Sequence, residues 1–201
     1  MLYQIPEEET GLPMVFLHGY GQSRMGWMTT PDGREGWSDM FLRMGHSVFL
    51  IDQPRRGEAG ATSVSGDIST KTLDQRWYTQ FRIGHWENGQ SVVNAGSQFP
   101  NDSESVDQFF RQMTPDTGMS SDMGSDIDKG DPSIPATGMW QMMRQAYYDF
   151  EAAYNAPGGN STVVDLPQEG ITGNDHFMFQ DMNNDVIAYH IEKWIQENVE
   201  I

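Results

Sequence analysis

The chain has 201 residues, 37% of them hydrophobic, which is enough for one domain with a core of its own. Its formal net charge of −17 would repel the phosphates of nucleic acids and of anionic membranes, so neither is expected as a partner. The absence of cysteine excludes disulfides, thiolate nucleophiles and cysteine-based metal sites.

No apolar run is long enough to span a bilayer, and the glutamates at positions 7–9 stand where a signal peptide would be apolar. We therefore expect a soluble protein, and its compartment is not fixed by the sequence. The acidic charge is uneven, since residues 1–100 carry 11 acidic and 8 basic residues, whereas residues 101–201 carry 18 and 4. A solvated acidic surface is the simplest explanation of this difference.

Two short apolar runs near the start, residues 14–17 and 47–52, are typical of buried parallel strands. Between them, Trp37 and Phe41 recur at helical spacing, and Gly45 ends the element. Strand, helix and strand in this order predict a βαβ unit whose two strands pair. Residues 162–166 form a third run, which we predict to be a further strand.

The middle of the chain is less regular. Residues 54–101 are predicted to be ordered loop, because glycine, serine and asparagine are scattered through them without a clear period. A helix is predicted over residues 102–113, and two more over residues 139–154 and from about residue 183. From Thr114 to Gly138, 19 of 25 residues are Gly, Pro, Ser, Thr or Asp, which predicts a flexible acidic linker at 114–138 within a single domain, residues 1–201.

Two motifs carry candidate chemistry. His18-Gly19-Tyr20-Gly21 directly follows the first predicted strand, and glycines there let backbone N–H groups approach a developing oxyanion. A tight strand-to-helix turn explains the same motif without any catalysis. His176 stands in a loop before the last predicted helix, where the catalytic base of an α/β-hydrolase would lie. The alternative for His176 is an ordinary solvent-facing histidine.

Several segments resemble a bacterial and fungal α/β-hydrolase family of the esterase/lipase type. They are residues 18–21, Pro31–Trp37, Asp52–Gly60 and Gly170–Asp181. The resemblance covers about residues 10–115 and 138–198, and it implies a reduced three-layer α/β-hydrolase-like sandwich with a short, mostly parallel sheet. It also implies a small ester-like substrate and no cofactor, with His18, Gly19, Tyr20 and Gly21 as the oxyanion or binding loop and His176 as the base.

The nucleophile of that family is missing. An elbow of the form Gly-x-Ser-x-Gly needs small residues two positions before and after the serine, because the turn packs a strand closely against a helix. Six serines have glycine two positions earlier, and each has a larger residue two positions later: Ser23, Ser38, Ser47, Ser91, Ser120 and Ser161. Ser120 is only a very weak candidate, since no strand precedes it.

The acidic partner of the histidine is missing too. Asp175 is too close in sequence to His176 for the usual arrangement, although Asp165 or Glu169 could substitute. No spacing of histidine, aspartate and glutamate matches a metal site, so none is predicted.

Three hypotheses remain open from the sequence. The chain is an ester hydrolase with an unconventional nucleophile, a relative that has lost catalysis and acts at most as a binding module, or an artificial or truncated chain without evolved function. We favour impaired catalysis, because the residues that would carry out acyl transfer cannot be identified. A thin core with exposed sheet edges would also favour oligomerisation.

Overall fold

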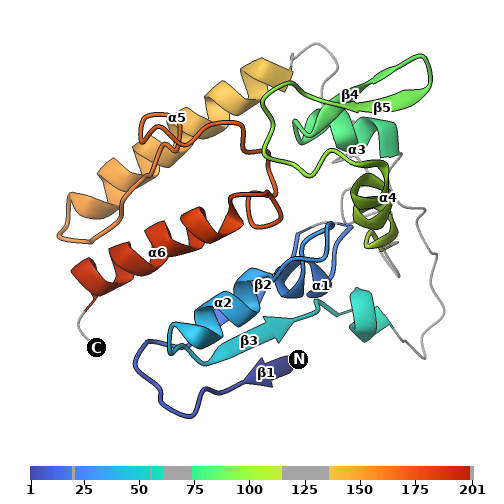
Figure 1. Cartoon of the computed structure of the whole chain (residues 1–201). Helices are drawn as coiled ribbons and strands as arrows, with labels where there is room; N and C mark the ends of the chain where they lie inside the picture. Colours follow the sequence, from blue (N-terminus) through green and yellow to red (C-terminus); the bar gives the residue numbers. More distant parts are fainter. Residues whose placement is uncertain (20, 55, 61–73, 115–135, 200–201) are drawn as a thin grey trace. The chain divides into compact units, whose positions relative to one another are not determined.

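The computed structural model describes residues 1–19, 21–54, 56–60, 74–114 and 136–199 (Figure 1). The chain divides into two compact units. The first consists of Met1–Ser120 and Gly173–Ile201, and the second consists of Ser121–Thr172. Both predicted site motifs, at His18 and at His176, therefore belong to the first unit.

A mixed three-stranded sheet with the order β1-β3-β2 lies in the first unit. Its strands are β1 (Leu2–Gln4), β2 (Met14–Leu17) and β3 (Val48–Ile51). β2 and β3 are parallel, which confirms the predicted pairing of the first two strands. β1, which the sequence pattern does not indicate, pairs antiparallel with β3, so the sheet has one parallel and one antiparallel pair.

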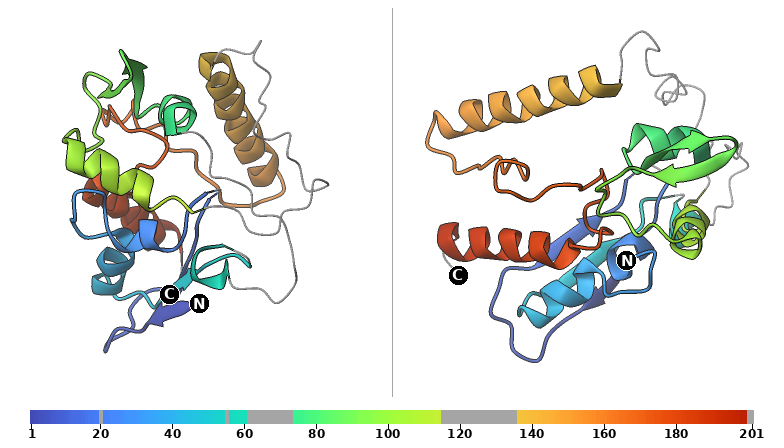
Figure 2. Two further views of the ribbon diagram at one scale, coloured as in Figure 1. Left: turned by 90° about the vertical axis from the view of Figure 1, so that its right-hand side faces the viewer. Right: turned by 45° about the horizontal axis from the view of Figure 1, so that its top comes forward.

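Helices lie against one face of this sheet. α1 (Met25–Met28) and α2 (Trp37–Arg43) connect β2 to β3, and α2 lies along β3 (Figures 1 and 2). α6 (Asn184–Asn198) packs against α2, and the Trp37 indole N–H donates to the carbonyl of Asn184 at 2.9 Å. The helices predicted at both places are therefore present.

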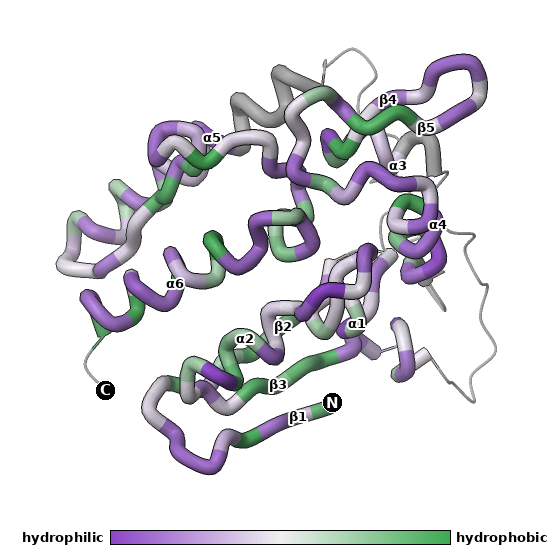
Figure 3. Tube along the Cα trace, viewed as in Figure 1, coloured by the Kyte–Doolittle hydropathy of each residue, from purple (hydrophilic) through white to green (hydrophobic). Residues whose placement is uncertain are grey.

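The two faces of the sheet differ because side chains alternate along each strand. Phe16, Val48 and Leu50 point into the core, and Figure 3 shows β3 as a hydrophobic segment. On the other face, Val15 and Leu17 of β2 are exposed. Association through exposed sheet edges stays a prediction.

A buried polar contact ties α6 to the start of β3. Nε2 of His46 lies 2.6 Å from a carboxylate oxygen of Glu192, and Nδ1 of the same ring lies 2.7 Å from the carbonyl oxygen of Leu12. The contact between His46 and Glu192 lies within the core, since both residues are buried. His46 is thus a structural residue that joins three segments distant in sequence.

The stretch predicted as loop, residues 54–101, contains regular structure, so that prediction is wrong. It holds the 3₁₀ helix η1 (Gly57–Gly60), α3 (Asp74–Gln80) and a hairpin of β4 (Gly84–Glu87) and β5 (Gln90–Val93). The hairpin turns at Asn88 and Gly89, whose φ angles are 51° and 81°. Two such left-handed residues form the tight turn that joins antiparallel strands. The pattern misses it because the strands alternate poorly, with Gly84, His85 and Gln90 among their residues.

The next helix agrees with its prediction. α4 (Ser103–Arg111) begins after Asp102, whose carboxylate accepts the Ser105 backbone N–H at 2.9 Å. Asp102 is therefore the N-cap of this helix. On the inner side of α4, Phe109 is buried against Phe99.

The second unit contains α5 (Ala136–Asn155), which includes the predicted helix. The strand predicted at residues 162–166 is absent, because no neighbouring strand pairs with this segment within the described part of the unit. Instead, the Val163 backbone N–H donates to the Glu151 carboxylate at 2.8 Å. Most of the predicted linker, residues 115–135, lies outside the described residues. Neither α5 nor any other helix within the described ranges is long and apolar enough to cross a bilayer.

Candidate active site

His18 is fixed in the turn that follows β2. The backbone N–H of Gln53 donates to Nε2 of its ring at 3.1 Å, so the ring carries its proton on Nδ1. Nδ1 lies 2.8 Å from the carbonyl oxygen of Gly19, which accepts that proton. The side chain is buried and both ring nitrogens are engaged, so His18 supports the turn rather than taking a proton from a substrate.

Asp52, at the end of β3, holds the same turn from the other side. One carboxylate oxygen accepts the Arg24 backbone N–H at 2.8 Å, and the other accepts the Glu58 backbone N–H at 3.1 Å. The guanidinium of Arg24 lies 3.6 Å from this carboxylate. Gly57 has a φ of 49°, and a Cβ there would lie 2.6 Å from Asp52 Oδ1. The close approach of η1 to Asp52 therefore requires glycine.

Gly21 brings the His-Gly turn against an aromatic ring. Its φ is 66°, its carbonyl oxygen accepts the Thr114 backbone N–H at 2.8 Å, and a Cβ there would lie 3.4 Å from Trp77. Tyr20 and Ser120, two of the predicted site residues, lie outside the described residues. The oxyanion role of residues 18–21 stays a prediction.

Trp77 links this turn to the histidine loop. Its ring stacks on Phe177 with centroids 6.0 Å apart and planes 9° from parallel. Phe177 is buried and also packs against Phe81 and Phe109. The two motifs predicted from the sequence thus both lie against one aromatic cluster that includes Trp77 and Phe177.

His176 lies on the solvent side of that cluster. Its backbone N–H donates to the Phe81 carbonyl at 3.1 Å, and its ring packs against Phe81 and Phe177 with centroids 4.6 and 5.0 Å away. The residue as a whole is exposed to solvent, but its ring is partly covered by these two phenylalanines. This burial, together with the smaller effect of the Arg82 charge, lowers the pKa of His176 to about 4. The imidazole is therefore neutral at neutral pH, but it is a weak base.

Two buried carboxyl groups, of Asp175 and Asp181, shape the loop that carries His176. Asp181 Oδ2 accepts the side-chain amide of Asn174 at 2.8 Å and the Asp175 backbone N–H at 3.1 Å. Asp175 Oδ1 accepts the Phe177 backbone N–H. Burial raises the pKa of Asp175 well above its usual range, and the charge of Asp181 adds a smaller increase. Burial also raises the pKa of Asp181, to about 6.

Arg82 stands beside this loop at the end of α3. Its backbone has a φ of 66°, which is unusual for a residue other than glycine. Burial lowers the pKa of its guanidinium, while the charges of Asp175 and Asp181 act in the opposite direction. The charge of Arg82 thus acts on both carboxyl groups and on His176.

The described serines offer no exposed elbow. Ser23, Ser38 and Ser47 are buried, Ser91 lies on the hairpin strand β5, and Ser161 belongs to the second unit. Asp165 belongs to the second unit as well, where its carboxylate accepts the Tyr148 hydroxyl at 3.2 Å. Within the described ranges, no three His, Asp or Glu side chains are grouped as a metal site requires.

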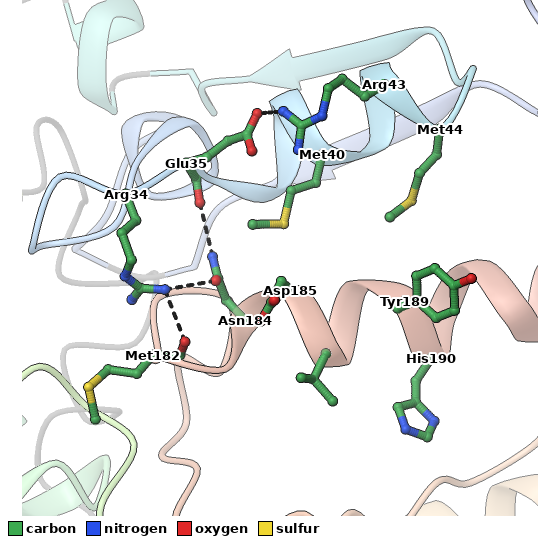
Figure 4. Close-up of a pocket in the computed structure, with 11 residues that line it drawn as sticks. Arg34, Glu35, Met40, Arg43, Met44, Met182, Asn184, Asp185, Tyr189 and His190 are labelled. Carbon is green, nitrogen blue, oxygen red and sulfur yellow. Dashed lines mark hydrogen bonds and ion pairs between the residues drawn. The ribbon is translucent and has the colours of Figure 1, made fainter.

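A groove between α2 and α6 is separate from these residues. It has a volume of about 790 Å³ and contains none of the predicted site residues. Met40 of α2 and Met44, which directly follows this helix, point toward α6, and Tyr189 of α6 lies on the side that faces them (Figure 4). At one end, Arg34 donates to the side-chain oxygen of Asn184 at 3.0 Å. The groove is an apolar surface feature rather than an extension of the His176 region.

Comparisons with known proteins address the origin of this arrangement. No protein-family model matches the chain. It is 45% identical over 76 residues to a probable secreted lipase, phiG, of Fungal sp. (strain ATCC 74256), and this match covers 34% of the chain and 21% of the lipase. Its structure matches that of a protein described as a novel bacterial esterase with a TM-score of 0.78 and 24% identity, covering 98% of this chain and 85% of the esterase.

The chain has a reduced α/β-hydrolase-like fold. Its fold is similar to that of the esterase, which confirms the predicted reduced α/β-hydrolase-like fold, and the partial match to a probable lipase agrees with the resemblance seen in its sequence. This α/β-hydrolase-like chain spans about a fifth of the length of the lipase that it matches. Its main sheet is small, with only the three strands β1, β3 and β2 within the described residues.

Sequence reasoning missed the residues that support the two motifs. Asp52 lies in a segment that carries the family resemblance, but nothing in its spacing shows that its carboxylate reaches Arg24 and Glu58. Asp181 stands five residues after His176, and Trp77 lies in the stretch predicted as loop. The one available signal was the density of aromatic residues between Trp77 and Phe99, which need a buried partner.

Proposed function

We propose that this chain is an esterase-like protein whose catalysis of acyl transfer is impaired. The observation that carries the proposal is the absence of a Gly-x-Ser-x-Gly elbow from the whole sequence. Without the nucleophile, oxyanion binding and substrate binding leave only roughly 10³–10⁴-fold acceleration over water. The related esterase and lipase make a small-molecule ester the substrate class to test.

The environment of His176 supports the same proposal. A general base works best when its pKa is near the pH at which the enzyme acts, and in a triad a neighbouring carboxylate helps to hold it there. Here burial and the positive charge of Arg82 lower the pKa of His176 to about 4. The imidazole would therefore accept a proton from a hydroxyl group far less readily than the base of an active hydrolase.

Hydrolysis of p-nitrophenyl acetate by the unmodified chain and by His176→Ala tests the proposal. We expect both rates to equal that of His190→Ala, which removes another imidazole, from a helix outside the His176 loop. The control is needed because free imidazoles also hydrolyse activated esters slowly. A rate that falls in His176→Ala but persists in His190→Ala would show that the chain is an active hydrolase and overturn the proposal.

A fluorophosphonate probe provides an independent test, since it forms a covalent bond with an activated serine and releases fluoride. We expect no labelling of the folded chain. Labelling that is lost when Ser120 is replaced by alanine would identify an unconventional nucleophile and contradict impaired catalysis.

The groove between α2 and α6 favours a second candidate, a non-catalytic binding module for small apolar molecules. Methionine side chains such as Met40 and Met44 adapt to ligands of different shape, and Tyr189 adds an exposed ring. Fluorescence of anilinonaphthalene sulfonate should rise on binding and fall back in Met44→Ser. An equal signal from the Met44→Ser variant would remove this candidate.

A further inference from the structure

The carboxyl groups of Asp175 and Asp181 are unusual because both are buried in one short loop. Their relative exposures are 2% and 0%. Together they accept three N–H groups, from the Asn174 side chain and from the backbones of Asp175 and Phe177. These bonds join the residues on both sides of His176, so the conformation of the loop depends on the two carboxyl groups.

Each carboxyl group also keeps one oxygen without a partner. Within the described residues, Asp175 Oδ2 and Asp181 Oδ1 are buried and make no hydrogen bond, and the hydroxyl of the neighbouring Tyr78 makes none either. A buried ionised carboxylate needs donors for its lone pairs, whereas a protonated carboxyl group costs far less to bury. This pattern of satisfied and unsatisfied oxygens is the one expected when one of the two groups keeps its proton.

The charged groups around the pair do not offset two negative charges. The charge of Arg82 acts on both carboxyl groups and that of Arg34 acts on Asp181, but the Arg34 guanidinium also donates to Asp32 at 2.6 Å. Tyr78 faces Asp175, and their proximity, after burial itself, raises the pKa of the tyrosine to about 12. Two ionised carboxylates at this place would repel each other in a medium of low polarity.

We propose that Asp175 and Asp181 together hold one proton at neutral pH, and that the protons of this pair keep the His176 loop closed, so that closure weakens stepwise as rising pH removes first one proton and then the other. The proposal rests on the proposed function only in treating His176 as the residue that the loop presents. Protonation of the pair acts as a pH-sensitive control of the loop, and the two aspartates are positioning residues for His176.

The sign of the pH dependence follows from the raised pKa values. An acid whose pKa is higher in the folded loop than in the open one binds more protons when the loop is closed, so closure weakens as pH rises. For Asp181 the change from 3.8 to about 6 corresponds to roughly tenfold weaker closure at about pH 8 than at about pH 5. Loss of the Asp175 proton adds to this effect at higher pH.

Hydrogen exchange of the Phe177 backbone amide measures closure directly, because that N–H donates to Asp175. In the unmodified chain we expect its protection factor, corrected for intrinsic exchange, to fall at least roughly tenfold between about pH 5 and about pH 8. In the double variant Asp175→Asn/Asp181→Asn, whose amides cannot ionise, the factor should stay constant. Asp185→Asn, which changes an exposed carboxylate at the start of α6, should behave like the unmodified chain.

The same fall in protection in the double variant and in the unmodified chain would overturn the proposal. If the double variant does not fold, infrared spectroscopy of the unmodified chain with isotope-labelled aspartate gives the answer. A carbonyl band from a protonated carboxyl group at about pH 7 supports the proposal, and its absence overturns it. Neither measurement uses ester hydrolysis, so an active enzyme would refute the proposed function while leaving the proton in place, and the reverse also holds.

Discussion

Two loops of the first unit carry the histidines predicted from the sequence, and buried carboxyl groups hold both of them in different ways. Asp52 supports the His18 turn with a donor on each of its oxygens and the Arg24 guanidinium nearby. Asp175 and Asp181 support the His176 loop while each leaves one oxygen without a partner in the described residues. The first loop thus uses a fully bonded carboxylate, and the second depends on a proton.

The largest effect expected from this comparison belongs to Asp52→Asn. The amide keeps one acceptor, but its NH₂ group would face a backbone N–H, either of Arg24 or of Glu58. A buried donor left unsatisfied, beside an Arg24 guanidinium that keeps only its contact with the exposed Glu58, should cost about 3 kcal/mol of the free energy of unfolding. Urea denaturation at neutral pH measures this loss.

Asp107→Asn is the matched control for that experiment. Asp107 pairs with Arg111 on the exposed surface of α4, and such a pair contributes about 0.5 kcal/mol or less. Equal losses in the two variants would show that the His18 turn does not depend on the Asp52 carboxylate, and the contrast between the two loops would then disappear.

Gly57→Ala tests the close approach of η1 to Asp52 and should have the next largest effect. Gly33→Ala is its control, because both glycines have positive φ, 49° and 80°, but a Cβ at Gly33 meets no atom within 4 Å. Backbone strain alone should cost about 1 kcal/mol at either position. Crowding against Asp52 should add about 2 kcal/mol at Gly57, and equal losses in thermal or urea unfolding would contradict this.

The parts of the fold predicted correctly are those whose signal is local. β2, β3, α2, α4 and α6 each show an apolar period or a cap that survives in the structure. The strand predicted at residues 162–166 has the right composition, but a strand also needs a neighbour, and composition does not supply one. The hairpin of β4 and β5 shows the reverse, because its turn at Asn88-Gly89 decides the structure while its strands alternate poorly.

The candidate site could be predicted only as far as its two histidines. His18 and His176 follow from their positions beside a strand and before the last helix. Their surroundings depend on contacts across long stretches of sequence, such as Gln53 N–H to the His18 ring and the Phe81 carbonyl to the His176 backbone. These contacts fix the His18 ring within its turn, while burial of the His176 ring and the charge of Arg82 lower the pKa of that histidine.

The smallest effect that we predict concerns the charge beside the second loop. Replacing Arg82 with methionine removes a positive charge that lowers the pKa of His176, so that pKa should rise from about 4 toward the ordinary value of 6.5. The rise should stop well short of 6.5, because burial against Phe81 and Phe177, the larger cause, remains. An NMR titration of the His176 ring measures the change, and Arg111→Met, which removes a surface charge, should leave the value unaltered. A pKa that stays at about 4 in the Arg82 variant would mean that the aromatic contacts alone make His176 a weak base.

Removing Arg82 also takes away a positive charge that favours ionisation of Asp175 and Asp181, so the same variant should extend the closed state of the loop to higher pH. The His18 turn has no such dependence on Arg82, and for this reason one substitution acts on the second loop and spares the first.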